Sequence, residues 1–456
     1  MVFPTLHFIL FFALVLALNG LVWHRAPWRK AMLIAASYTF YAAWDVRFLA
    51  LMAGVSTIAW LGGLWAYHRP VKWLSLTLLI ATLAAFKYFN FFLLSLSQLF
   101  EGSALIRDLQ WISIILPVGI SFYIFQAISY VMDSARGDIT PRRNPTDVFL
   151  YISFFPQLVA GPIVRAAHFL PQIDAPTAPD ARARAVAVTL ILTGLFKKMV
   201  VANYLSVLLV DPAFALPDGQ NTVTAIAATL GYAVQIYCDF SGYSDIAIGI
   251  ALLLGYQFKR NFNQPYRAAS LREFWQRWHI SLSTWIRDYL YIPLGGNSGS
   301  ALRSGTTLMI TMTLAGFWHG AAWNFIAWGA LHGLGLLVAR HFTRHLPRAV
   351  TTLLTFTTVC LLWIPFRAAD MTETTAMLSA LITLDGYAPV DLSPTILALI
   401  TIGLAMNWLP LRWLEHTQTA LAKAPAIAQA LILAFGIWLF FAAAQDGVAP
   451  FIYFQF

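Results

Sequence analysis

Charged residues are scarce in this 456-residue chain. Asp, Glu, Lys and Arg together make up 11% of it, whereas a typical soluble domain carries about 25%. Hydrophobic residues account for 59% and aromatic residues for 15%. Because a single core stops growing beyond roughly 250–300 residues, it cannot bury this much apolar surface. The composition therefore excludes an ordinary soluble enzyme and predicts that lipid surrounds much of the chain.

Cysteine and several catalytic motifs are also lacking. Two cysteines, Cys238 and Cys360, are too few for a disulfide framework, a four-cysteine zinc site or a cysteine-bound cluster. No Gly-x-Ser-x-Gly, His-Glu-x-x-His or nucleotide-binding glycine pattern occurs in the sequence. We therefore predict no metal site and no tightly bound cofactor.

Apolar runs of about 20 residues, the length that crosses a bilayer, recur along the chain. Pro156 and Gly161-Pro162 interrupt one run, and we expect further breaks at 239–242 and around 316–324. Asp239 and Asp245 could cap helix ends beside the second break or line a tunnel, and we favour capping. The pattern predicts an all-α polytopic membrane protein with about eleven transmembrane or re-entrant helices. The candidate spans lie near 3–23, 31–44, 48–67, 72–99, 111–133, 148–168, 186–210, 222–257, 304–340, 350–368, 394–411 and 426–445.

Basic residues mark the loops that we expect on the cytoplasmic side. These loops lie at 25–30, 69–72, 136–143, 259–303, 340–348 and 412–423, while the acidic or uncharged connections at 101–108, 211–218, 370–391 and after 446 are expected outside. This alternation predicts that the N-terminus lies outside, on the periplasmic side. We interpret the net charge of +9 as a topology signal and a contact with membrane lipid, and we predict no nucleic-acid partner.

The segment 259–303 has an unusual charge balance, with seven Lys or Arg residues against two acidic ones. Within it, a basic face accompanies four large apolar residues at helical spacing, namely Phe274, Trp278, Leu282 and Trp285. This pattern is typical of an amphipathic helix that lies in the membrane interface and anchors the chain. Membrane anchoring alone does not explain three polar residues in this segment, namely His279, Ser281 and Ser283.

Two histidines, His319 and His279, are candidates for a catalytic role. His319 lies in an apolar span between Gly316 and Gly320, where an ionisable group is costly to bury and is a functional candidate by default. An imidazole can accept a proton from a hydroxyl as a general base. His279 lies forty residues earlier and also follows a tryptophan, so the pair is compatible with direct acyl transfer to an alcohol. His332 fits a helix-packing face of small residues better.

Two other classes of function remain open at this point. A transporter or flippase explains broken helices and an intramembrane histidine, but it predicts related halves, and the sequence shows no internal repeat. A non-catalytic membrane scaffold that docks a periplasmic enzyme is the third interpretation.

Several motifs together resemble the membrane-bound O-acyltransferase (MBOAT) family. Residues 274–279 (Phe-Trp-Gln-Arg-Trp-His) and 285–289 (Trp-Ile-Arg-Asp-Tyr) are followed by 316–320 (Gly-Phe-Trp-His-Gly). Further blocks narrow the resemblance to the bacterial alginate O-acetyltransferase branch; they lie at 153–163, 239–245, 261–266, 291–297 and 451–456.

The resemblance implies a ring of about eleven helices around a thin centre, crossed by a tunnel from a cytoplasmic donor mouth to an outer acceptor mouth. It implies an acetyl-CoA-type donor, a polysaccharide acceptor beyond a bacterial inner membrane, and a periplasmic acetyltransferase or acyl-accepting partner protein. We treat 1–456 as one integral-membrane domain, with N-terminal spans over 1–110, a catalytic core over 111–345 and C-terminal spans over 346–456.

The resemblance also implies roles for single residues. His319 would be the catalytic histidine, and His279 the second histidine of the family signature. Trp318, Asn324 and Trp278 are candidates for lining the tunnel or donating a hydrogen bond to the oxyanion. Three basic residues could attract the phosphates of the donor or, equally, bind anionic lipid heads at ~1 kcal/mol per charge; they are Arg277, Arg287 and Lys259.

Overall fold

The computed structural model describes residues 3–100, 114–159, 161–216, 220–342, 346–382 and 390–444. Every regular element within these ranges is a helix, and they contain no strand, which confirms the all-α prediction. The expected outer loop at 101–108, Arg344 and the motif at 451–456 lie outside the described residues.

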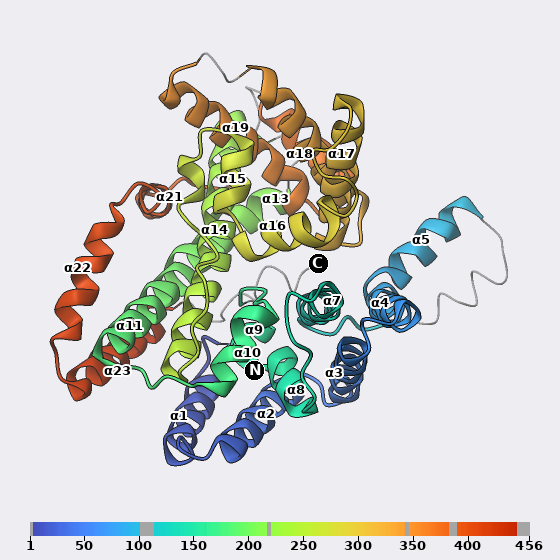
Figure 1. The fold of residues 1–456 in the computed structure, drawn as a ribbon. Helices are drawn as coiled ribbons and strands as arrows, with labels where there is room; N and C mark the ends of the chain where they lie inside the picture. The colour runs from blue at the N-terminus through green and yellow to red at the C-terminus, as the bar shows by residue number, and fades with distance from the viewer. Residues whose placement is uncertain are drawn as a thin grey trace. The chain divides into compact units, whose positions relative to one another are not determined.

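The helices pack into two units, Met1–Ala178 with Leu254–Tyr256, and Pro179–Leu253 with Gln257–Phe456. In the first unit α2, α3 and α8 pack together, and α7 packs on α3 and α4. The elements of this unit, drawn in blue to green in Figure 1, are α1 (Leu6–Leu21), α2 (Ala26–Ala42), α3 (Phe48–Leu64), α4 (Arg69–Leu83), η1 (Ala84–Tyr88), α5 (Phe89–Leu99), α7 (Ile120–Arg136), α8 (Pro145–Ser153), α9 (Phe155–Leu158) and α10 (Ala166–Asp174).

The second unit is built on a long buried helix, α14, along which α11 packs (Figure 1). A pair of closely packed helices, α17 and α18, joins α19 and α15 in the same unit. Its elements are α11 (Ala181–Leu195), η2 (Phe196–Ala202), α12 (Asn203–Leu205), η3 (Ser206–Val210), α13 (Asp211–Ala215), α14 (Thr222–Leu253), η4 (Pro265–Arg267), α15 (Leu271–Arg277), α16 (Ile280–Ile286), η5 (Arg287–Tyr291), α17 (Ala301–His319), α18 (Trp323–Phe342), α19 (Arg348–Arg367), α20 (Met371–Ala380), α21 (Pro394–Ala405), α22 (Leu411–Ala422) and α23 (Ala426–Ala443).

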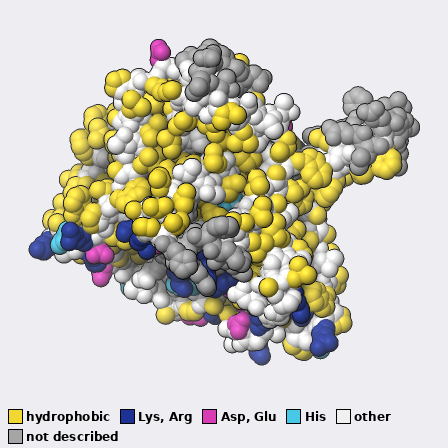
Figure 2. Space-filling view, turned by 90° about the horizontal axis from the view of Figure 1, so that it is seen from above, with side chains coloured by type: hydrophobic (Ala, Val, Ile, Leu, Met, Phe, Trp, Pro, Cys, Tyr) yellow, Lys and Arg dark blue, Asp and Glu magenta, His cyan; other side chains and the backbone are white. Residues whose placement is uncertain are grey.

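Several helices have the length and composition of membrane spans. Within the described residues, five continuous helical stretches meet both criteria, at Arg69–Ser97, Ala181–Ala215, Thr222–Leu253, Arg348–Arg367 and Ala426–Ala443. Hydrophobic side chains cover much of the face in Figure 2, as expected for a surface in contact with lipid. The complete ring of about eleven helices stays a prediction.

Two of the three expected breaks are confirmed. In the run at 148–168, α8 ends at Ser153 and the short α9 and α10 follow, with Pro156 in the first turn of α9. In the run at 304–340, α17 ends at His319 and α18 begins at Trp323. The break expected at 239–242 was a wrong prediction, because α14 continues through it without interruption.

Close packing explains why α14 does not break at Gly242. A Cβ atom at Gly242 would lie 2.8 Å from the carbonyl oxygen of Gly194 on α11, and a Cβ atom at Gly194 would lie 2.6 Å from that of Gly242. The two glycines thus let the two backbones approach each other, a role typical of small residues between membrane helices.

The aspartates of α14 form ion pairs instead of capping helix ends, so the capping prediction was also wrong. Asp239 pairs with Lys198, and Asp245 accepts a 2.6 Å hydrogen bond from Lys197. Both lysines lie on the π-helical turn η2. Such a turn widens the helix locally and is frequent at functional sites. The charges that suggested a polar break are therefore neutralised inside the helix pair.

The single amphipathic helix expected over 271–289 is divided into α15 and α16. The helix breaks at Trp278 and His279, where the backbone of His279 has the left-handed φ of 43°. The predicted apolar stripe faces the protein core rather than lipid, since its members are all buried: Phe274, Trp278, Leu282 and Trp285. The interpretation of this segment as a membrane anchor was therefore wrong.

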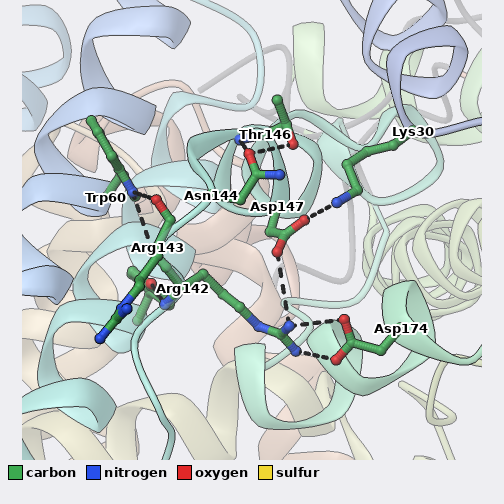
Figure 3. Close-up of polar contacts among 9 residues, drawn as sticks. Lys30, Trp60, Arg142, Arg143, Asn144, Thr146, Asp147 and Asp174 are labelled. Carbon is green, nitrogen blue, oxygen red and sulfur yellow. Dashed lines mark hydrogen bonds and ion pairs between the residues drawn. The ribbon is translucent and has the colours of Figure 1, made fainter. Parts of the chain in front are cut away.

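Loops that were expected on one side of the membrane lie together within the first unit. Lys30 pairs with Asp147, and Arg142 pairs with Asp174 at 2.6 Å and with Asp147 at 3.8 Å (Figure 3). The indole nitrogen of Trp60 donates to the carbonyl of Arg142. The network joins the basic loops at 25–30 and 136–143, as the predicted topology requires; the side on which they lie stays a prediction.

Arg29 binds the three-residue peptide Leu254–Tyr256, which follows α14 and belongs to the first unit. Its guanidinium is buried and donates to Asn19 Oδ1 at 2.9 Å and to the carbonyl of Leu254 at 2.6 Å. The same group lies 4.4 Å from the ring centroid of Trp23 and 5.0 Å from that of Tyr256. The carbonyl of Leu254 and the ring of Tyr256 thus both contact one cation, which cation–π contacts stabilise further.

Candidate active site

A cavity of about 630 Å³ lies within the second unit among α15, α16, α17 and α18. Its wall is apolar where α17 and α18 contribute Leu308, Met312 and Leu336. Exposed polar side chains also line it, including Arg272 on α15 and Arg287 on η5. A mostly apolar cavity with a few polar groups is the usual form of a site for a small ligand.

His319 lines this cavity from the last residue of α17. Its side chain is 3% exposed, and its ring centroid lies 5.0 Å from that of Trp318, 5.0 Å from that of Trp328 and 5.2 Å from that of Phe366. The aromatic rings hold the imidazole in place and limit its exposure to water, which strengthens any electrostatic interaction that it makes. An imidazole in this position can take a proton from a hydroxyl in the cavity.

His279 lies close to the same tryptophan but does not line the cavity in the described part of the chain. Its ring centroid is 6.5 Å from that of Trp318 and 4.6 Å from that of Phe240. Nδ1 lies 3.3 Å from Asn261 Oδ1. Burial lowers the pKa of His279 to about 3, so the imidazole is neutral at physiological pH. The structure therefore brings both predicted histidines against Trp318, with His319 alone on the cavity.

The three basic residues predicted to bind the donor lie in different surroundings. Arg287 lines the cavity, and its Nε donates to Asp288 Oδ1 at 2.7 Å, a contact that raises the pKa of Arg287. Arg277 forms a 2.8 Å ion pair with Glu273, and Lys259 is exposed on the loop after α14; neither lines the cavity.

Comparison with known proteins gives the chain a family. The family model "MBOAT, membrane-bound O-acyltransferase family" matches residues 62–364, which make up more than half of the chain. The chain belongs to the membrane-bound O-acyltransferase family. A probable alginate O-acetylase AlgI of Azotobacter vinelandii is 39% identical, covering 83% of this chain and 77% of that protein. The AlgI of Pseudomonas putida is 36% identical, covering 94% and 95%. A peptidoglycan O-acetyltransferase of Helicobacter pylori is 35% identical, covering 80% and 76%.

The protein is thus a multi-pass membrane O-acyltransferase, and the three tunnel or oxyanion candidates can be placed within it. Trp318 contacts both histidines. Trp278 is buried in an aromatic cluster, 5.0 Å from Phe262 and 5.0 Å from Trp363 between ring centroids. Asn324 Nδ2 donates to the carbonyls of Pro365 at 3.1 Å and Ala368 at 2.6 Å.

Asn324 therefore holds the C-terminal end of α19, since both of its amide hydrogens are used there. The geometry gives no support to an oxyanion role for this amide. Arg272 is one of the cavity residues of the acyltransferase that were not predicted from the sequence. Its four-residue spacing to Gln276, which also lines the cavity, places both on one face of α15 and was a usable signal.

Gly316 brings α17 and α18 together one turn before His319, so a substitution there should disturb the acyltransferase site. A Cβ atom at Gly316 would lie 2.2 Å from the carbonyl oxygen of Phe325 and 2.9 Å from the Cα of Gly329. Gly316→Ala should therefore lower the free energy of unfolding by about 1–3 kcal/mol and reduce transfer, because these backbone atoms cannot move aside cheaply. Denaturation in detergent measures the first effect.

The matched control is Gly305→Ala on the same helix, whose Cβ would meet only Leu337 Cδ2, at the ordinary contact distance of 3.7 Å. Equal stability of the two variants would contradict the packing argument.

Proposed function

We propose that this acyltransferase moves an acetyl or other short acyl group from a cytoplasmic thioester donor of the acetyl-CoA type across a bacterial inner membrane. The acceptors are hydroxyls of an extracytoplasmic polysaccharide, reached through a periplasmic partner protein. The names of the relatives support this acceptor class, since they act in alginate O-acetylation and peptidoglycan O-acetyl transfer. The proposal needs no tightly bound cofactor.

The position of His319 carries the proposal. Its imidazole is buried among aromatic rings and lines the cavity of about 630 Å³. The chain that carries it belongs to a family of acyltransferases. Acyl transfer to an alcohol needs such a base, because a hydroxyl is a weak nucleophile until its proton is taken.

The reaction follows from that position. A ring nitrogen of His319 takes the proton of the acceptor hydroxyl as its oxygen attacks the thioester carbonyl carbon, and a C–O bond forms. The negative charge on the carbonyl oxygen is met by a donor, for which the indole N–H of Trp318 is our candidate. The C–S bond then breaks, and the leaving thiolate receives the proton from the imidazolium. His279 orients the acceptor or His319.

Reconstitution tests the proposal directly. Purified protein in liposomes receives acetyl-CoA with a labelled acetyl group, together with the periplasmic partner and the polysaccharide, and label on the polysaccharide is measured. We expect transfer by the wild type and none above background by His319→Ala. A scaffold gives no acetyl release from either protein, and a flippase moves substrate without acyl chemistry. Either result with the partner present would overturn the proposal.

The two arginines on the cavity should bind the donor rather than lipid. Arg272→Gln and Arg287→Gln are each expected to raise KM for an anionic donor about 2–5-fold, since an exposed charge contributes at most ~1 kcal/mol. The increase should shrink at high salt because the charges are screened.

Lys259→Gln is the control, since Lys259 is exposed but does not line the cavity. KM is measured for the three variants in liposomes of fixed lipid composition. An equal rise in all three would assign these charges to anionic lipid heads instead.

A further inference from the structure

Asn261 is a buried amide on the loop after α14, and it connects three parts of the second unit. Its Oδ1 accepts hydrogen bonds from the backbone N–H of Ser281 at 3.1 Å and from Ser281 Oγ at 2.9 Å. Its Nδ2 donates to Ser244 Oγ on α14 at 3.2 Å, and its carbonyl accepts from the N–H of Ile280 at 2.9 Å. The side chain is therefore fixed from both ends.

These contacts determine which way the amide points. A backbone N–H can only donate, so the Asn261 atom that faces the N–H of Ser281 is the oxygen. The same oxygen lies 3.3 Å from His279 Nδ1. A neutral imidazole carries one proton, and an unprotonated Nδ1 would place two acceptors against each other. Nδ1 therefore carries the proton and donates to Asn261, which leaves the lone pair on Nε2.

The backbone conformation of His279 is a second reason to expect a neighbouring residue that holds it in place. Its φ of 43° is left-handed, and Gln264 is the other described non-glycine residue with a positive φ. Conformations of this kind persist where the surroundings hold them, and they cluster at functional sites. Asn261 contacts the ring of His279, and its carbonyl holds the N–H of the next residue, Ile280. One residue thus fixes both the ring and the turn.

We propose that Asn261 is a positioning residue that holds His279 in the Nδ1–H form, so that Nε2 is its acceptor atom during acyl transfer. The part of His279 in the transfer rests on the proposed function; the tautomer does not. Rings that pack on His279 include those of Phe240, Phe262 and Trp318. Ser281 Oγ also lies 3.5 Å from Nδ1, and because it donates its proton to Asn261 Oδ1, it faces Nδ1 as an acceptor too. The shorter contact, from Nδ1 to Asn261, selects the tautomer and also fixes the orientation of the Ser281 hydroxyl.

Nitrogen NMR of the full-length protein in lipid nanodiscs reads the tautomer without any reaction. Histidines carry nitrogen-15, and His279→Gln identifies the His279 signals by their loss. In the wild type we expect a protonated nitrogen at Nδ1 and an unprotonated one at Nε2. In Asn261→Ala this preference should be lost. A proton on Nε2 in the wild type overturns the proposal, whether or not the protein transfers acetyl groups.

Asn263→Ala is the matched control, because Asn263 lies on the same loop and meets Arg277 through backbone atoms. It should keep the wild-type spectrum. If Asn261→Ala also keeps it, Asn261 does not select the tautomer.

Kinetics give a second test with a variant of nearly the same shape. Asn261→Asp keeps the acceptor but adds a negative charge, which favours the imidazolium and should raise the pKa of His279. The acid limb of the kcat/KM profile should then move to higher pH. Asn261→Ala should lower kcat/KM by about 10–100-fold, by analogy with the loss seen when a residue that orients a metal-binding histidine is removed. An unchanged pH profile in Asn261→Asp, with its unfolding temperature intact, would contradict the proposal.

Discussion

Replacing His319 with alanine should lower kcat for acyl transfer about 10²–10⁴-fold, because a positioned general base contributes that much to the rate. KM for the donor should change little, since the arginines at the cavity remain. The measurement is transfer of labelled acetyl groups by the reconstituted protein at saturating donor. His319→Gln, which keeps a polar side chain but not a base of suitable pKa, should be equally inactive.

A histidine outside the site controls for this loss. His416 is exposed on α22, so His416→Ala should retain full activity. Circular dichroism and unfolding in detergent should show that His319→Ala is folded. If folded His319→Ala turned over within about tenfold of the wild type, His319 could not supply the proton transfer that the mechanism requires.

Removing one charge of the Lys198–Asp239 pair should have the largest effect on stability. The two side chains are 2% and 4% exposed, between two helices that span the membrane by length and composition. Lys198→Met removes the cation that pairs with the carboxylate of Asp239 in an apolar interior, which should cost about 3–5 kcal/mol of the free energy of unfolding. Denaturation in detergent at a fixed protein-to-detergent ratio measures it.

The double variant Lys198→Met/Asp239→Leu separates charge from packing. It removes both charges together and should recover most of the loss, because an apolar pair of similar volume is often as stable as a buried ion pair. Lys197→Met is the milder comparison, since the Lys197 and Asp245 side chains are 14% and 18% exposed. A double variant as unstable as the single one would show that shape, rather than charge, holds α11 to α14.

Local patterns were sufficient to predict many helices and the position of His319. Apolar length and interrupting prolines are properties of a short stretch of chain, so the helices at 6–21 and 426–443 could be recognised without knowing their neighbours. The same locality caused the error in α14. Asp239, Ser241 and Gly242 together resemble a helix break, and nothing near them in sequence reveals Lys198 or Gly194 across the interface.

The site itself was predictable only in part. A histidine between glycines in an apolar run is visible in the sequence, whereas the use of the Asn324 amide depends on where α19 ends. Asn261 belongs to a motif, yet its contact with His279 exists only after the chain turns at Trp278. That turn was hidden because Phe274, Trp278 and Leu282 keep helical spacing across it.

The three-residue peptide held by Arg29 also constrains the order in which the protein can be built during synthesis. The first unit consists of residues up to Ala178 and of Leu254–Tyr256, so the ribosome must complete α11 and α14 before the last contacts of this unit are available. Until then the guanidinium of Arg29 lacks the carbonyl of Leu254 and the ring of Tyr256. A split version of the protein should therefore supply residues 254–256 to the N-terminal fragment, because a chain that ends at residue 178 gives Arg29 neither of these two contacts.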